Sequence, residues 1–299
     1  MRRRRWVKWA LAAYFVAFLL FLYGPMIVMA VLSFQGPQGG ISFPMRGFSL
    51  HWWDQLVDGP RADTIRETAG RSLRLGLISG AIVAFLALTL SMAYRRRFRG
   101  DNAVFYLIML ALMTPGILLS LGTALYWQFL GEPTSLWRTV VGTHVVWGLP
   151  FGFLVMVAVW NRYSNSVEEA SRDLGAGAFR TFREVTLPLI WTGLLGAFLF
   201  GFTLSWNDYD RTALLAGGEN TLPLQIFALT IGSVIRPDLY ALGTATTLVS
   251  LLAVGILLVV AGVLRRRRGR PVAEATVEEE MGLLESDLPE GELAGSGGR

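Results

Sequence analysis

Two carboxylates near the end of a long apolar segment are of the residue types that could bind a cation. Asp208 and Asp210 follow Trp206 and Asn207, and Tyr209 stands between the two acids. A carboxylate can form an ion pair with an organic cation, and an aromatic ring adds a cation–π contact of about 0.5–2 kcal/mol. This cluster predicts contact with an organic polycation, with Trp206, Asn207, Asp208 and Asp210 as candidate residues on a solute path.

The same cluster also allows a structural interpretation. Trp206 and Tyr209 are the residue types that gather where a helix meets the membrane surface. Asp210 precedes Arg211 and could pair with it in water. Arg211 could neutralise the acids, which weakens the prediction of a cation site, so both interpretations stay open on the sequence.

Other reactive residue types are scarce. The chain has no cysteine, which excludes disulfides, thiol nucleophiles and thiolate metal sites. Only His51 and His144 could supply imidazole, and His144 stands alone in an apolar segment, where a hydrogen-bonded packing role is expected. Lys8 is the only lysine, so the chain has no Walker A loop for ATP. We therefore predict no catalytic residue, no metal site and no cofactor on this chain.

A charged island interrupts the apolar chain at residues 168–188, EEASRDLGAGAFRTFREVTLP. Ser166 and Glu169 have the spacing of a capping box, which predicts a short helix that runs to about Leu174. Glycines at 175 and 177 are expected to end this helix.

A second short helix is predicted over residues 178–185, with Phe179 and Phe182 on one side. Pro188 then lies near the first turn of the next apolar helix, where proline is tolerated. Exposed phenylalanines suit a groove on a partner protein. The alternative is a hairpin that lies on lipid headgroups.

The spacing within this island resembles the EAA loop of bacterial ABC importer permeases. Glu169-Ala170-Ser171, then Gly175, then nine residues and Val185-Thr186-Leu187-Pro188 follow that pattern, with Ser171 and Val185 as mild departures. The resemblance implies that the loop docks into a groove of a separate ATPase subunit and transmits its closure to the membrane helices. The implied coupling residues are Glu169, Ala170, Gly175, Phe179, Phe182, Leu187 and Pro188.

Other stretches are similar to the second permease subunit of spermidine/putrescine importers, namely residues 94–100, 114–115, 202–208 and 221–227. The resemblance implies polyamine import. Relatives with this framework carry opines, amino acid derivatives, phosphonates or ferric ion, so these solutes stay open. It also implies four partners: cytoplasmic ATPase subunits that bind ATP and Mg, a second homologous permease, an extracytoplasmic binding protein and the lipid bilayer. No nucleic acid is expected.

Six apolar segments must position these residues. Each lacks Asp, Glu, Lys and Arg and is long enough to cross a bilayer core of about 30 Å as a helix. They are residues 9–34, 75–94, 103–130, 139–160, 185–206 and 239–264. The predicted fold class is all-α, an integral membrane protein with six transmembrane helices and the EAA loop between the fourth and fifth. Buried helices of a large soluble protein are the alternative.

Basic residues predict the orientation. Eighteen of the 27 lysines and arginines lie at ends that share one side if six helices alternate. Positive residues stay in the cytoplasm, which predicts that both termini lie inside. The resemblance to bacterial importer permeases implies a multi-pass protein of the bacterial inner membrane. A nucleic-acid site in the arginine runs is the weaker interpretation, because each run adjoins a membrane segment. The first apolar segment is too long for a signal peptide.

Three regions follow: a basic cytoplasmic N-terminus at 1–8, a six-span permease domain at 9–264, and a basic and then acidic tail at 265–299. The tail from residue 271 carries eight acids and one arginine, which predicts a disordered, solvated segment.

Small residues recur at every fourth position in two segments, Gly76, Gly80 and Ala84 and then Gly193, Ala197 and Gly201, which predicts close helix packing. Helix breakers at Pro25, Pro115, Pro150 and Pro188 predict kinked helices. Such kinks suit a lumen that opens and closes, and irregular packing is the alternative that kinks alone do not exclude.

A self-contained secondary transporter remains the alternative function. It would need ionisable groups within the spans, where only His144 lies. A membrane enzyme lacks a reactive constellation.

Overall fold

The structure is a computed structural model that describes residues 3–96, 98–232 and 236–268. The chain forms two units, Met1–Val254 and Gly255–Arg299, and the described part of the second is the end of one helix. The predicted acidic tail lies outside the described residues from 269 onward.

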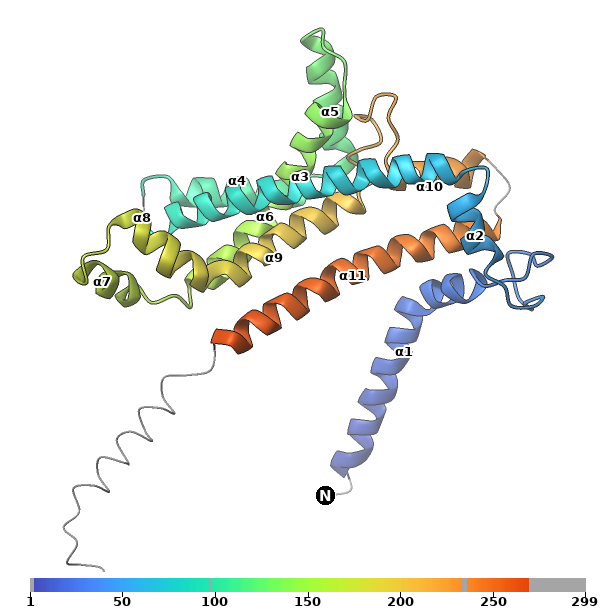
Figure 1. Ribbon diagram of the computed structural model, residues 1–299, viewed down its shortest axis with the longest axis horizontal. Helices are drawn as coiled ribbons and strands as arrows, with labels where there is room; N and C mark the ends of the chain where they lie inside the picture. The colour runs from blue at the N-terminus through green and yellow to red at the C-terminus, as the bar shows by residue number, and fades with distance from the viewer. Residues whose placement is uncertain (1–2, 97, 233–235, 269–299) are drawn as a thin grey trace, which may run out of the picture. The chain divides into compact units, whose positions relative to one another are not determined.

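The described residues are mainly helical (Figure 1). The helices are α1 (Arg3–Leu32), α2 (His51–Asp58), α3 (Ala62–Tyr94), α4 (Asp101–Met113), α5 (Gly116–Phe129), η1 (Leu136–Val140), α6 (Val141–Trp160), α7 (Ser166–Asp173), α8 (Ala178–Thr181), η2 (Phe182–Thr186), α9 (Leu187–Trp206), α10 (Leu222–Gly232) and α11 (Pro237–Arg268). The described residues hold no strand, and Gln35 and Phe48 form an isolated bridge.

Five helices are long and apolar enough to cross a membrane, and the bent pair α4 and α5 makes up to six. This agrees with the predicted all-α membrane protein. α3 begins thirteen residues before the predicted apolar segment, and α2 and α10 were not predicted, because their short amphipathic or apolar patterns are too brief to separate from loops.

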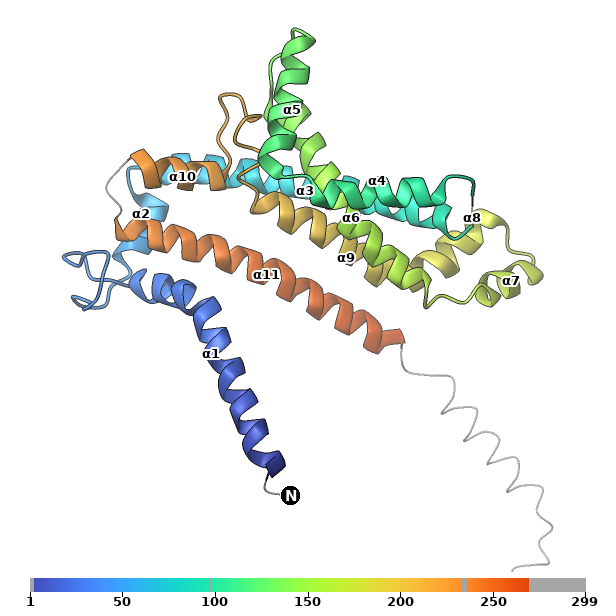
Figure 2. The same ribbon diagram turned by 180° about the vertical axis from the view of Figure 1, so that it is seen from behind.

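The core consists of α3, α6 and α9, which lie side by side in both views (Figures 1 and 2). The predicted small-residue faces meet: a Cβ added to Gly201 would lie 2.8 Å from the Cα of Gly80 and 2.8 Å from the Cβ of Val83. Gly152 of α6 packs at the same crossing, 2.9 Å from Val83 by the same measure. The close packing predicted for the fifth segment is therefore confirmed.

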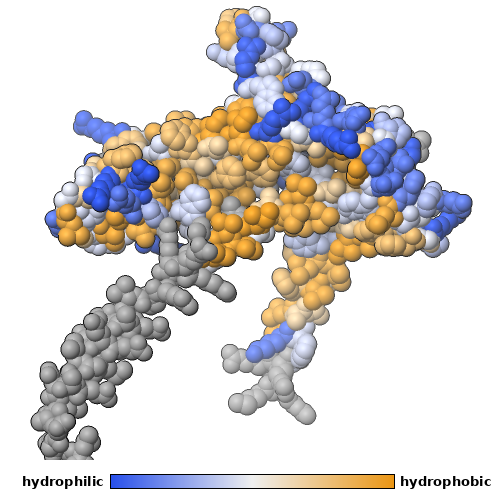
Figure 3. Space-filling model, in the orientation of Figure 1, coloured by the Kyte–Doolittle hydropathy of each residue, from blue (hydrophilic) through white to orange (hydrophobic). Residues whose placement is uncertain are grey.

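Side-chain polarity divides along these helices. Figure 3 shows hydrophobic residues over the middle of the first unit and hydrophilic residues around α7 and around the loops near α2 and α10. Leu73, Phe85, Tyr106, Leu107 and Phe200 are among the exposed apolar side chains. Exposed apolar side chains over this part of the molecule suit contact with lipid or with another membrane subunit.

The predicted third span at 103–130 is not one continuous helix. α4 and α5 meet at 104°, with Thr114 and Pro115 between them. Pro115 has no N–H to donate and keeps Thr114 out of the helical region, at ψ 119°. The prediction of a kink was too mild here. Pro25 and Pro150, in contrast, lie inside α1 and α6, which continue through them.

Candidate functional site

The charged island folds as two short helical pieces between α6 and α9. α7 ends at Asp173, and Gly175 takes φ +85°, the left-handed conformation that glycine adopts without strain. The second piece runs through α8 and η2 to Thr186 and continues into α9, one residue beyond the predicted end.

The predicted capping box did not form. Asn165 is the N-cap residue of α7 and makes no side-chain cap bond. Its carboxamide oxygen instead accepts a hydrogen bond from Arg95 at the end of α3. The hydroxyl of Ser166 contacts that of Ser164. The contact with α3 therefore replaces the local cap.

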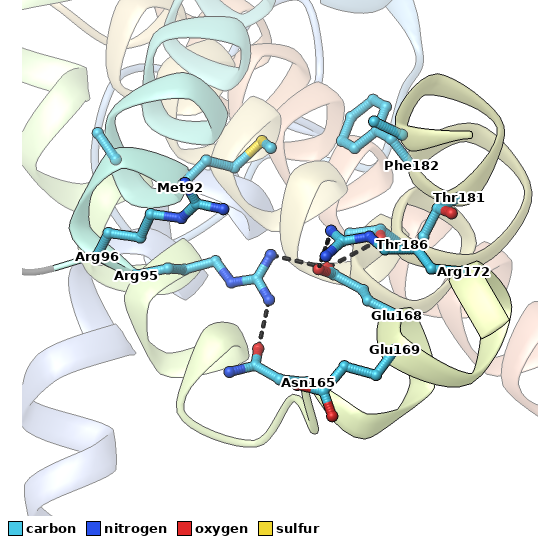
Figure 4. A pocket seen from close by; sticks show the side chains of 12 residues that line it. Met92, Arg95, Arg96, Asn165, Glu168, Glu169, Arg172, Thr181, Phe182 and Thr186 are labelled. Atoms are coloured by element: carbon cyan, nitrogen blue, oxygen red, sulfur yellow. Dashed lines mark hydrogen bonds and ion pairs between the residues drawn. The ribbon is translucent and has the colours of Figure 1, made fainter. Parts of the chain in front are cut away.

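An ion pair attaches α7 to α3 (Figure 4). Arg95 Nη1 donates to Glu168 Oε1 at 2.8 Å, and the two side chains are 19% and 12% exposed. Thr186 also donates to Glu168 Oε1, at 3.1 Å. The guanidinium of Arg95 lies 4.4 Å from the ring centre of Trp160 and 5.1 Å from that of Tyr163. One arginine thus joins α3, the end of α6 and the island.

The charge of Glu168 is stabilised by this arrangement. Burial alone would raise the pKa of its carboxyl. The hydrogen bond and positive charge of Arg95, with the hydroxyl of Thr186, outweigh burial and hold the pKa below its usual range. Glu168 also lies 3.6 Å from Arg172, one turn further along α7. The attachment is therefore charged at neutral pH.

A cavity of about 580 Å³ opens beside this ion pair. Met92, Arg96, Glu169, Arg172 and Phe182 are among the residues that line it (Figure 4). Phe182 is half-buried here. The prediction that Phe179 and Phe182 share an exposed side is therefore wrong for Phe182, because the continuous helical turn from α8 into η2 directs it toward the α3 end.

The exposed residues of the island include two apolar side chains and one unpaired acid. Phe179 is 76% exposed, Leu174 is 89% exposed, and Glu169 is exposed with no ion-pair partner among the described residues. Leu174 was not among the predicted residues. Its exposure could have been predicted from its position, because Leu174 directly precedes Gly175, where α7 has ended and the turn carries the side chain outward. Ala170 is exposed, and Leu187 and Pro188 are half-buried at the start of α9.

The predicted cation cluster at the end of α9 is arranged differently. Asp208 is buried, and its side chain is 2% exposed. Its Oδ2 accepts a hydrogen bond from Arg211 Nη1 at 2.8 Å, and its Oδ1 accepts one from the Arg211 backbone N–H at 2.8 Å. Arg211 therefore pairs with Asp208. The structural interpretation, which paired Arg211 with Asp210, is wrong on this point.

A polar network surrounds this pair. His144 of α6 contacts Ser205 Oγ at 2.7 Å through Nδ1 and Thr212 Oγ1 at 3.0 Å through Nε2. Its Nε2 lies 3.8 Å from Asp208 Oδ1. The hydrogen-bonded packing role predicted for His144 is confirmed, and the network fixes the segment after α9 to α6.

The guanidinium of Arg211 lies against an aromatic face. Its Cζ is 3.8 Å from the ring centre of Trp147, the shortest such distance in the described part of the chain. A Cβ added to Gly116 would come 3.0 Å from that Cζ. Ser120 Oγ is within hydrogen-bond distance of the backbone oxygens of Asp210 and Arg211. The bend between α4 and α5 is thus built against this segment.

The other cluster residues divide by exposure. Trp206 is buried, whereas Asn207 and Asp210 are exposed. Asn207 donates to the carbonyl of Thr203 at 3.0 Å. Within the described residues the carboxylate of Asp210 has no ion-pair partner. Only Asn207 and Asp210 are therefore open to a solute in this conformation.

Comparison with known families assigns this chain to a family. Residues 73–270 match the family described as binding-protein-dependent transport system inner membrane component. The chain belongs to this family. It is therefore a multi-pass membrane subunit of an ABC importer, a transport component and not an enzyme.

Three curated relatives align with most of this chain. It is 28% identical over 233 residues to the spermidine/putrescine transport system permease protein PotC of Haemophilus influenzae, which is 77% of this chain and 88% of that protein. It is 29% identical over 247 residues to PotC of Escherichia coli K12, with 81% and 89% covered. The E. coli K12 putrescine transport system permease protein PotI is 28% identical over 233 residues, with 75% and 80% covered.

Solved structures share the fold of this permease. A bacterial ABC transporter for the acidic polysaccharide alginate matches with TM-score 0.61 and 16% identity over 88% of this chain and 96% of that chain. The methionine transporter MetNI matches with TM-score 0.57 and 14% identity over 69% and 98%. At these identities the likeness concerns the fold alone.

Proposed function

We propose that this permease moves a polyamine of the spermidine or putrescine type across the inner membrane. The observation that carries the proposal is the similarity to PotC and PotI over at least 75% of this chain. The exposed carboxylate of Asp210 beside Asn207 suits an ammonium group that arrives at this end of α9.

We further propose that the charged island, residues 168–188, couples the permease to a separate ATPase that binds ATP and Mg. Leu174 and Phe179 present apolar side chains that suit a groove on a partner. Glu169 adds an unpaired charge on the same short segment. The complete importer would also contain a second permease subunit and an extracytoplasmic binding protein.

Uptake by reconstituted vesicles tests the solute. Vesicles that hold the chain with its co-purifying subunits should accumulate radiolabelled putrescine or spermidine when ATP and loaded binding protein are supplied. Uptake of an anionic or zwitterionic solute in place of both polyamines would refute the polyamine proposal and leave the family assignment intact.

Labelling of single cysteines tests the orientation, with the termini proposed to be cytoplasmic. The native chain has no cysteine, so each introduced residue is the only target. Cysteines at Gly39 and Gly218 should react from outside in intact cells, and a cysteine at Ser286 should react only after lysis. External labelling at Ser286 would contradict the orientation.

A further inference from the structure

The Asp208–Arg211 pair has the composition of a site for an organic cation that is already filled. The carboxylate of Asp208 and the ring face of Trp147 are the two groups that recognise an alkylammonium or guanidinium ion. Arg211 supplies such an ion from within the chain, at 2.8 Å from the carboxylate and 3.8 Å from the ring centre. We call Trp147, Asp208 and Gly116 the cage.

The cage is closed in this conformation. Asp208 and His144 have side chains 2% and 1% exposed, whereas Arg211 is 11% exposed and forms the edge. Both carboxylate oxygens accept hydrogen bonds from Arg211. A solute ammonium can therefore reach Asp208 only after the guanidinium has left.

The contacts that hold the guanidinium of Arg211 leave one of its nitrogen atoms without a hydrogen bond. In the described part of the chain, the buried Nε of Arg211 has no hydrogen-bond partner, which disfavours this position. Arg211 is also the more exposed member of the ion pair, at 11%, and one side-chain hydrogen bond, from Nη1 to Asp208 Oδ2, holds its guanidinium to the carboxylate, so rotation of the side chain releases it. These two features allow another cation to replace it.

We propose that Arg211 is a tethered cation that occupies the cage at rest and that the ammonium group of the transported solute displaces it. This inference rests on the proposed polyamine function for the nature of the solute. A tethered group has a high effective concentration at its site, on the order of millimolar for short flexible links. Isolated cations at low concentration would thus be excluded, and a solute released locally by a binding protein would compete.

Chemical rescue of Arg211→Ala tests the cage in the purified full-length chain with its co-purifying subunits. The variant should unfold at a lower temperature, because Asp208 stays buried without its partner. Methylguanidinium or putrescine should restore the unfolding temperature, and KCl at equal ionic strength should not. The double variant Asp208→Asn with Arg211→Ala should show no cation-specific response.

Arg61→Ala is the matched control. Arg61 pairs with Asp238 at 3.0 Å and is not part of the cage, so added cations should not restore stability specifically. A response of Arg211→Ala to KCl equal to that for methylguanidinium, or an equal response of the double variant, would overturn the cage. Methylguanidinium is not the proposed solute, so this result is independent of which solute is carried.

Uptake provides the second measurement, which also covers failure of Arg211→Ala to fold. Gly116→Ala keeps the ion pair but places a methyl group 3.0 Å from the Cζ of Arg211, which should loosen the tethered cation. Either variant should lower the polyamine concentration for half-maximal uptake. For Arg211→Ala the expected factor is about tenfold, because the solute no longer has to break the charged hydrogen bond from Arg211 Nη1 to Asp208 Oδ2. Unchanged half-maximal concentrations in both variants would refute displacement.

Discussion

Replacing Glu168 with glutamine removes the negative charge that attaches α7 to α3 and nearly preserves the shape of the side chain. The hydrogen bond from Arg95, at 2.8 Å, is charge-assisted, and such bonds contribute about 1.5–3 kcal/mol. The glutamine oxygen can still accept a weaker bond from Arg95 or Thr186. We therefore expect a loss of about 1–2 kcal/mol in the local stability of α7.

Hydrogen exchange of the backbone amides measures this local stability directly. A loss of this size should speed exchange within α7 by about tenfold, because 1.4 kcal/mol corresponds to a factor of ten. Exchange within the buried core of α3, α6 and α9 should stay as in the wild type. Under the coupling proposed above, loaded binding protein should then stimulate ATP hydrolysis less, because a loosely attached island would transmit less of the movement of the ATPase.

The matched control is Glu184→Gln in the same island. Glu184 pairs with Arg180 at 2.9 Å, but these side chains are 58% and 70% exposed, so the change should leave α7 unaffected. Equal exchange rates in α7 for Glu168→Gln and Glu184→Gln would show that the ion pair with Arg95 does not hold the island.

Three further predictions concern the same elements. The ion pair between α7 and Arg95 should be stable at neutral pH and should weaken as pH falls through the lowered pKa of Glu168. A carboxyl whose pKa is lowered by folding stabilises the fold while it is ionised and loses that contribution when it is protonated; hydrogen exchange of α7 amides at a series of pH values measures the change. Gly175→Val should cost about 1–2 kcal/mol at φ +85°, whereas Gly177→Val, at φ −68°, should cost less, as thermal unfolding of the purified chains would show. Gly201→Val should reduce the yield of folded protein, because its Cβ would lie 2.8 Å from Gly80; normal yield and stability would contradict the α3–α9 crossing.

Patterns that depend on neighbours along the chain were predictable. The spacing of Gly76, Gly80, Gly193 and Gly201 marked the helix faces that meet, because small residues four apart lie on one side of a helix. The role of Gly175 followed in the same way, from the need for a left-handed turn after α7.

Pairings between distant residues were not predictable. Nothing in the local sequence indicates that Glu168 pairs with Arg95, 73 positions earlier, or that the predicted capping box of Ser166 and Glu169 does not form. Asp208 was chosen as a solute contact from its type, but its burial depends on how α6 packs against the segment after α9. The 104° bend at Pro115 was underestimated, because a proline signals a break without giving its angle.

Arg95 has one role during membrane insertion and another in the folded chain. During insertion, in the orientation proposed here, the translocation machinery senses only that a cation stands after α3, and a lysine would serve equally. In the folded chain the flat guanidinium donates to both Asn165 and Glu168 and stacks near Trp160, which an ammonium group cannot reproduce. Arg95→Lys would therefore yield a protein that is threaded correctly and assembled incorrectly, a defect invisible to topology assays.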